Sequence, residues 1–174
     1  MQLHINPTLE DYRIAKLAAL AIGVHVLESI LPSPIPGVKP GMANIVTLLV
    51  FLLYGLNAAV WVSMLRVVVG SLIVGSFLSP TFVLSFSGAI ASIFILMVLS
   101  NIEQVKISAV SIALLMAMAH MSSQFMVVYV FFIPHNALFD ILPVMMTAAL
   151  VFGFINGILA QKIFEKIKLN NVNG

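Results

Sequence analysis

Four long stretches without a charged side chain constrain the fold of this 174-residue chain more than any other feature. They have 24, 36, 33 and 21 residues, and they lie between Gly41 and Arg66, Arg66 and Glu103, Lys106 and Asp140, and Asp140 and Lys162. A helix of about 20 apolar residues crosses a bilayer. Charged residues make up 8% of the chain, too few for a soluble domain of this length. The sequence therefore predicts a polytopic integral membrane protein.

Prolines, glycines and polar residues divide the apolar sequence into six expected spans within one transmembrane domain, residues 1–174. Backbone groups in lipid must bond within the chain, and the stretches lack the alternation of barrel strands, so we predict an all-α six-helix bundle. The expected spans are residues 10–31, 42–56, 58–78, 81–100, 105–133 and 137–167. The second is short, because fifteen residues rise only about 22 Å.

The basic residues predict the orientation in the cytoplasmic membrane. With the N-terminus inside, six of the eight fall on the cytoplasmic side: Arg13, Lys16, Lys106, Lys162, Lys166 and Lys168. Only Lys39 lies outside, and Arg66 lies within the third span. We therefore expect a multi-pass protein with both termini in the cytoplasm.

The loop at residues 31–41, LPSPIPGVKPG, is unusual in so apolar a chain, because it combines four prolines with a lysine. Prolines restrict the loop and so reduce the entropy lost when it closes over a ligand. Gly37 and Gly41 flank Lys39 and provide flexibility. We interpret the loop as an external lid whose tip carries Lys39; the alternative is a stiff connector with a solvated lysine.

Polar side chains gather in the outer half of the expected bundle. His25 and Glu28 share a face of the first span, Asn44 lies at the outer end of the second, and His120 and Gln124 are four residues apart in the fifth. Ionisable groups at this depth are costly and usually face a cavity or one another. We predict a ligand pocket; the alternative is that these groups only bond the helices together.

Arg66 is expected near the middle of the membrane, where an unpaired arginine costs several kcal/mol. It needs a carboxylate, backbone carbonyls or an anionic ligand, and both a structural pairing and a ligand contact remain open. Nearby Gly70 and Gly75 permit close approach of another chain segment.

Ala15, Ala19 and Gly23 repeat every four residues and therefore share one face of the first span. Small residues at this spacing allow another helix to approach closely in a membrane. That helix belongs either to a partner protein or to the chain's own bundle.

Several kinds of chemistry are not expected. The chain has no cysteine, its histidines lack metal-ligand spacing, and it has no Walker lysine motif. The segment SFSGAIAS (residues 85–92) is similar to the Ser/Thr-Gly-Ala-Thr site of covalent flavin mononucleotide attachment, but Ile90 occupies the acceptor position. We therefore expect no metal, no cofactor and no enzymatic activity.

Two segments, LPSPIPGVKPGMANIVTLL (residues 31–49) and RVVVGSLIVGSFLSPTFVLSFSGAIAS (residues 66–92), resemble the Gx transporter family, whose members are often labelled heptaprenyl diphosphate synthase component I. That family is grouped with the S components of energy-coupling-factor (ECF) vitamin transporters. The resemblance implies that Ala15 and Ala19 match a helix surface that docks on a transmembrane coupling subunit. It also implies a gating first loop.

The sequence and the resemblance together suggest a substrate-binding subunit that works with a coupling subunit and ABC ATPases. The expected ligand is a small polar or anionic vitamin-like molecule, bound by Lys39, Asn44, Arg66, His120 and Gln124, with His25 and Glu28 nearby. The alternative is a non-catalytic membrane subunit of a flavin- or quinone-linked electron-transfer or quinone-biosynthesis system. No nucleic-acid partner is expected.

Overall fold

The computed structural model describes residues 8–30, 41, 43–101 and 107–172, and these residues fold into six α-helices without any β-strand among them. The helices are α1 (Leu9–Ile30), α2 (Ala43–Tyr54), α3 (Leu56–Val74), α4 (Pro80–Ser100), α5 (Ala109–Val127) and α6 (Leu142–Val172). A π-helical turn, η1 (Val128–Phe132), continues α5, and a 3-10 turn, η2 (Asn136–Asp140), precedes α6. The all-α prediction is confirmed.

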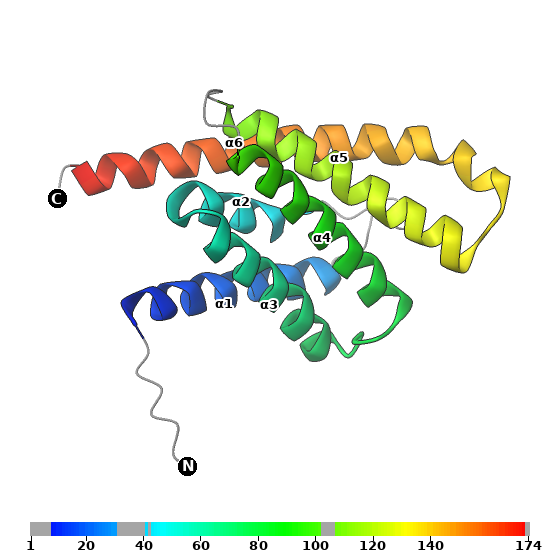
Figure 1. Cartoon of the computed structure of the whole chain (residues 1–174), viewed down its shortest axis with the longest axis horizontal. Helices are drawn as coiled ribbons and strands as arrows, with labels where there is room; N and C mark the ends of the chain where they lie inside the picture. Colours follow the sequence, from blue (N-terminus) through cyan, green and yellow to red (C-terminus); the bar gives the residue numbers. More distant parts are fainter. Residues whose placement is uncertain (1–7, 31–40, 42, 102–106, 173–174) are drawn as a thin grey trace, which may run out of the picture.

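The six helices form a closed ring. Each packs against the next in the order α1, α3, α4, α5, α6, α2, and α2 packs against α1 again. Figure 1 shows α1 beside α3 and α5 beside α6 on opposite sides of an elongated molecule, with α4 crossing between them. The short α2 also contacts α3 and α5. This arrangement turns one face of every helix toward a common interior.

Two helix ends near the predicted break at residues 79–80 are explained by local chemistry. α3 ends at Val74 rather than at the expected Leu78, because Gly75 adopts a left-handed backbone with φ 74° and caps the helix. α4 begins at Pro80, whose missing N–H is of no consequence in a first turn, and the Ser79 side chain caps that turn.

The fifth and sixth expected spans are less regular than the sequence suggested. The described part of the fifth is α-helical only from Ala109 to Val127, and then widens into the π-turn η1. The sixth begins with the 3-10 turn η2, and α6 then continues to Val172. Pro143 lies in the first turn of α6, where it breaks no helical hydrogen bond.

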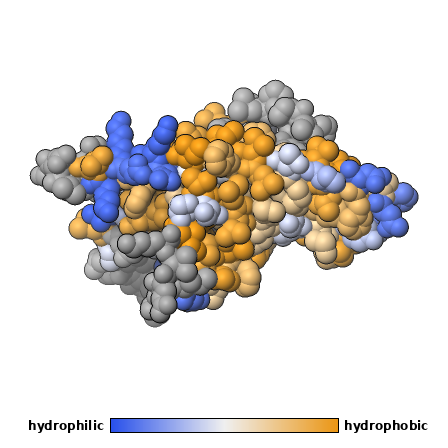
Figure 2. Space-filling model, turned by 90° about the horizontal axis from the view of Figure 1, so that it is seen from above, coloured by the Kyte–Doolittle hydropathy of each residue, from blue (hydrophilic) through white to orange (hydrophobic). Residues whose placement is uncertain are grey.

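Four helical segments are each long and apolar enough to cross a membrane: Leu56–Val74, Pro80–Ser100, Ala109–Phe132 and Asn136–Leu169. Large apolar side chains on them face outward, including Phe94, Phe131 and Phe154. Figure 2 shows a broad hydrophobic band over the middle of the molecule with hydrophilic residues toward both ends. An exposed apolar surface of this extent is typical of contact with lipid, which supports the prediction of a polytopic membrane protein.

The two N-terminal helices differ from these four. α2 has only 12 residues, a rise of about 18 Å, and α1 carries several charged residues in its first two turns. Length and composition thus support four of the six predicted membrane crossings. The crossings by α1 and α2 stay a prediction. The orientation of the bundle stays a prediction.

Gly157 allows α5 and α6 to pack closely, and its replacement gives a clear test of that interface. A Cβ atom on Gly157 would lie 2.6 Å from the Cα of Val110, a backbone atom that cannot move aside without shifting α5. We expect Gly157→Ala to lower the free energy of unfolding by about 1–3 kcal/mol, measured by thermal unfolding in nanodiscs.

The matched control for this substitution is Gly23→Ala, because a Cβ atom on the exposed Gly23 would meet no atom within 4 Å. Alanine is the better helix former by about 1 kcal/mol, so this variant should unfold at the wild-type temperature or above it. Equal unfolding temperatures for the two variants would show that α5 and α6 are not tightly packed at Gly157.

Candidate functional site

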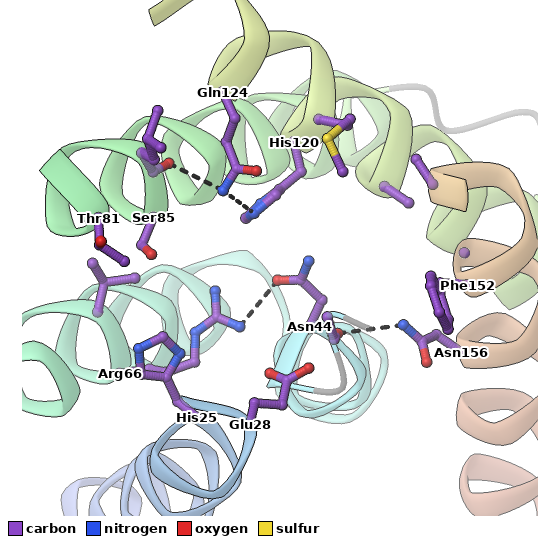
Figure 3. Close-up of a pocket in the computed structure, with 17 residues that line it drawn as sticks. His25, Glu28, Asn44, Arg66, Thr81, Ser85, His120, Gln124, Phe152 and Asn156 are labelled. Atoms are coloured by element: carbon purple, nitrogen blue, oxygen red, sulfur yellow. Dashed lines mark hydrogen bonds between the residues drawn. The ribbon is translucent and has the colours of Figure 1, made fainter. Parts of the chain in front are cut away.

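The interior of the ring contains a cavity of about 390 Å³ to which all six helices contribute. Figure 3 shows its lining, with ten labelled residues: His25 and Glu28 from α1, Asn44 from α2, Arg66 from α3, Thr81 and Ser85 from α4, His120 and Gln124 from α5, and Phe152 and Asn156 from α6. A cavity of this size accommodates a small organic molecule.

The structure brings together six of the seven residues predicted from the sequence to bind a substrate. They are His25, Glu28, Asn44, Arg66, His120 and Gln124, and each lines the cavity. Lys39 lies outside the described residues. The two interpretations of the polar cluster are compatible, because some of these side chains bond between helices while also facing the cavity. Their contact with a ligand remains a prediction.

Arg66 is almost fully buried, with 4% of its surface exposed. Its Nη1 atom donates to Asn44 Oδ1 at 3.0 Å, and its buried Nε atom has no hydrogen-bond partner among the described residues. The carboxylate of Glu28, a residue that is 5% exposed, attracts the guanidinium electrostatically. The described contacts therefore use only part of the donor capacity of a cation that faces the cavity.

The imidazole of His25 occupies the space above Gly70 in α3. A Cβ atom on Gly70 would lie 2.7 Å from His25 Cδ2, so only glycine leaves room for the ring. The sequence suggested that Gly70 permits a close approach near Arg66, and the structure shows that His25 of α1 makes that approach.

His120 is held in the same manner against Gly88 of α4, where an added Cβ atom would lie 2.5 Å from the ring. Its Nδ1 atom is 3.3 Å from Ser92 Oγ, and its Nε2 atom is 3.1 Å from Gln124 Nε2. Gln124 Nε2 also donates to the Leu84 carbonyl at 3.3 Å. Both ring nitrogens of His120 thus already have protein partners.

The end of the loop at residues 31–41 is attached to two helices at the edge of the cavity. Gly41, with a left-handed φ of 66°, accepts hydrogen bonds through its carbonyl from the Asn44 backbone N–H at 2.9 Å and from Asn156 Nδ2 at 3.3 Å. Since Asn44 also accepts from Arg66, a continuous set of hydrogen bonds joins the loop end to the buried cation.

Several lining residues were missed by the sequence reasoning: Thr81, Ser85, Phe152, Gly153 and Asn156. Asn156 could have been identified, because it is an amide within the 21-residue uncharged stretch before Lys162. Ser85 belongs to the SFSGAIAS segment, which we considered only as a flavin site. In the structure that segment supplies Ser85 to the cavity lining, Gly88 to the contact with the His120 ring, and Ser92 to a hydrogen bond with His120.

The small-residue face of α1 points away from the bundle. Ala15, Ala19 and Gly23 are all exposed, whereas Ala18 and Ala21 of the same helix are buried in the core. Of the two possibilities left open by the spacing, packing within the chain's own bundle is therefore wrong for the described structure. The face is available to a partner or to lipid.

The chemistry of the cavity suits binding. Among the described residues, no group of three or more histidine, aspartate, glutamate or cysteine side chains is placed to hold a metal ion. The lining combines one cation, one carboxylate, amides and hydroxyl groups with apolar residues such as Met121 and Phe152. Such a surface can orient a polar or charged molecule while covering its apolar part.

A family model described as heptaprenyl diphosphate synthase component I matches residues 17–163 of the chain. The match covers most of α1, all of α2 to α5, and most of α6, and thus every residue labelled in Figure 3. No curated protein and no solved structure matches.

Proposed function

The chain belongs to the heptaprenyl diphosphate synthase component I family, and on that premise we propose that it is the substrate-binding subunit, or S component, of an ECF-type ABC importer. In this role it captures a small polar or anionic vitamin-like molecule from outside the cell. It does so in the cytoplasmic membrane, with both termini inside.

The observation that carries this proposal is the buried cation in a cavity lined by all six helices. An arginine inside a membrane protein is costly unless its donors are satisfied. Among the described residues Arg66 donates a hydrogen bond to Asn44 through Nη1, and an anionic ligand in the cavity that Arg66 lines would supply further acceptors. A group retained at such a cost is typical of a binding site.

Uptake also needs an energy source, which the chain's sequence does not provide. We propose that a transmembrane coupling subunit with its ABC ATPases docks on the small-residue face Ala15–Ala19–Gly23. The outward orientation of that face supports this assignment, because small residues at this spacing allow close helix contact.

The Pro-rich loop at residues 31–41 is proposed to close over the ligand, with Lys39 contacting its anionic group. The loop's described end, Gly41, lies in the cavity lining. We expect Lys39→Ala to weaken ligand binding about 3- to 10-fold, the loss of one charge-assisted contact near solvent, as measured by titration in nanodiscs. Unchanged affinity would make Lys39 a solvated residue of a connector.

We further propose that the chain does not itself synthesise a prenyl diphosphate, despite the description of its family. Such synthases use two aspartate-rich motifs to hold magnesium on the diphosphate. The only aspartates here are Asp11, in the first turn of α1, and Asp140, in η2. These elements lie at opposite ends of the molecule (Figure 1), so the two carboxylates cannot share one magnesium ion.

A second candidate is a non-catalytic membrane subunit of a flavin- or quinone-linked electron-transfer or quinone-biosynthesis system. The family description favours it, because a prenyl diphosphate is a precursor of quinone side chains. The apolar Leu84 and Met121 beside Gln124 would also suit a quinone ring.

Native mass spectrometry of the protein released from lipid nanodiscs separates the two candidates. The S-component function predicts that a water-soluble metabolite leaves the cavity, and that a membrane vesicle accumulates it only when the coupling module and ATP are present. Release of a quinone, or a mass increase from a covalent flavin, would overturn the transport proposal.

A further inference from the structure

Two backbone carbonyls fix the orientation of the side chains on the α5 wall of the cavity. The Leu84 carbonyl can only accept, so the Gln124 group that lies 3.3 Å from it is the amide nitrogen. The same nitrogen lies 3.1 Å from His120 Nε2. Both amide hydrogens are thereby used, and the oxygen Oε1 is the one atom of this amide left to bond a ligand.

The same reasoning sets the tautomer of His120. Because Gln124 donates to Nε2, that nitrogen must accept, and the ring proton lies on Nδ1. Nδ1 donates to Ser92 Oγ at 3.3 Å, and Ser92 in turn donates to the Met116 carbonyl at 3.4 Å. Every group in the series Gln124–His120–Ser92 therefore has a compatible partner.

The hydrogen bond from Gln124 requires a neutral His120. The titratable groups that line the cavity are Arg66 from α3, His25 and Glu28 from α1, and His120 itself; α2, α4 and α6 contribute none among the described residues. An imidazolium would turn Nε2 into a donor facing the donors of Gln124.

We propose that the ligand carries two recognition groups: an acidic group bound by Arg66, and a hydrogen-bond donor accepted by Gln124 Oε1 on the opposite wall (Figure 3). In this arrangement His120 and Ser92 are positioning residues that hold the Gln124 amide and do not themselves bind the ligand. The inference rests on the proposed function and specifies its ligand class. An acid without a donor at its other end would bind less tightly.

The first test needs no ligand. Nitrogen NMR of ¹⁵N-histidine-labelled protein in nanodiscs, with His120 assigned by His120→Asn, should give a neutral ring protonated on Nδ1. A ring protonated on Nε2, or on both nitrogens, would overturn the proposal. In either case the Gln124 amide would have to turn its oxygen toward His120, and the cavity would lack the acceptor.

The second test uses matched probes, namely unbranched carboxylic acids of increasing length and their ω-hydroxy derivatives. At one chain length the hydroxy acid should bind the nanodisc-held protein roughly 2- to 10-fold more tightly, the effect of one hydrogen bond. Gln124→Met should remove that advantage, so that the hydroxy acid and the simple acid bind this variant equally.

The outcomes of this second test distinguish the two proposals. Equal affinity of both acids at every length would overturn the ligand class while leaving the anion site of the proposed function intact. Failure of every acid to bind would contradict the anionic ligand of the proposed function. The NMR of His120 would in that case still test the orientation of the Gln124 amide on the α5 wall.

Discussion

Arg66→Met is expected to weaken ligand binding by on the order of 100-fold, the loss of about two charge-assisted hydrogen bonds. The same variant should also unfold at a lower temperature than the wild type. Arg66 and Glu28 are both almost fully buried, at 4% and 5% exposed, and Arg66 also donates to Asn44. Removing only the cation leaves the Glu28 carboxylate without its charge partner, which is destabilising.

Two measurements on nanodisc-held protein check this expectation: the fraction of protein that retains the ligand in native mass spectrometry, and the unfolding temperature of the empty protein. Arg66→Lys is the control, because it keeps the charge but lacks the planar fork of the guanidinium. Its ligand retention and its unfolding temperature should lie between those of the wild type and of Arg66→Met. A lower unfolding temperature with unchanged ligand retention would show that Arg66 serves only the fold.

Ala19→Leu is expected to abolish assembly with the coupling subunit while sparing ligand binding. Ala19 is exposed, so the larger side chain meets no neighbour within the chain's own core, and the unfolding temperature should hardly change. Close helix contact through a small-residue face, however, is blocked by a single bulky residue. The readout is co-purification with the coupling subunit, alongside ligand retention by the isolated protein.

Val151→Phe is the matched control for Ala19→Leu. It adds bulk to an exposed apolar position on α6, a helix that does not pack against α1 in the ring. It should leave assembly unchanged. Two results would contradict the proposal that the docking face and the binding cavity act separately. They are loss of assembly in both variants, and loss of ligand binding together with assembly in Ala19→Leu.

The sequence predicted the helical fold well, because long uncharged stretches leave few alternatives in lipid. Helix ends were predicted less well, since they depend on local backbone conformation. Gly75 ends α3 before the expected residue, and the π-turn η1 has no clear sequence signal. The closed order of the ring was not predictable either, because nothing in one sequence reports which helix faces lie together.

At the site, the sequence identified the costly groups but not their partners. Arg66, His120 and Gln124 stood out because polar side chains are rare in these spans. Ser92 and Leu84 hold His120 and Gln124 from a different helix, across 28 and 40 residues of sequence. From the sequence, Gly88 could be recognised only as a small residue in a packed segment. Its role depends on the His120 ring that lies against it in the structure.

The closed ring has a consequence for how the protein is made. α2 is synthesised well before α6, yet the two helices pack together, and Asn156 bonds to Gly41 across 115 residues of sequence. Until α6 is inserted, the cavity is open on one side and Arg66 is not fully enclosed. We therefore expect a chain truncated after α5 to be a preferred substrate of membrane proteases.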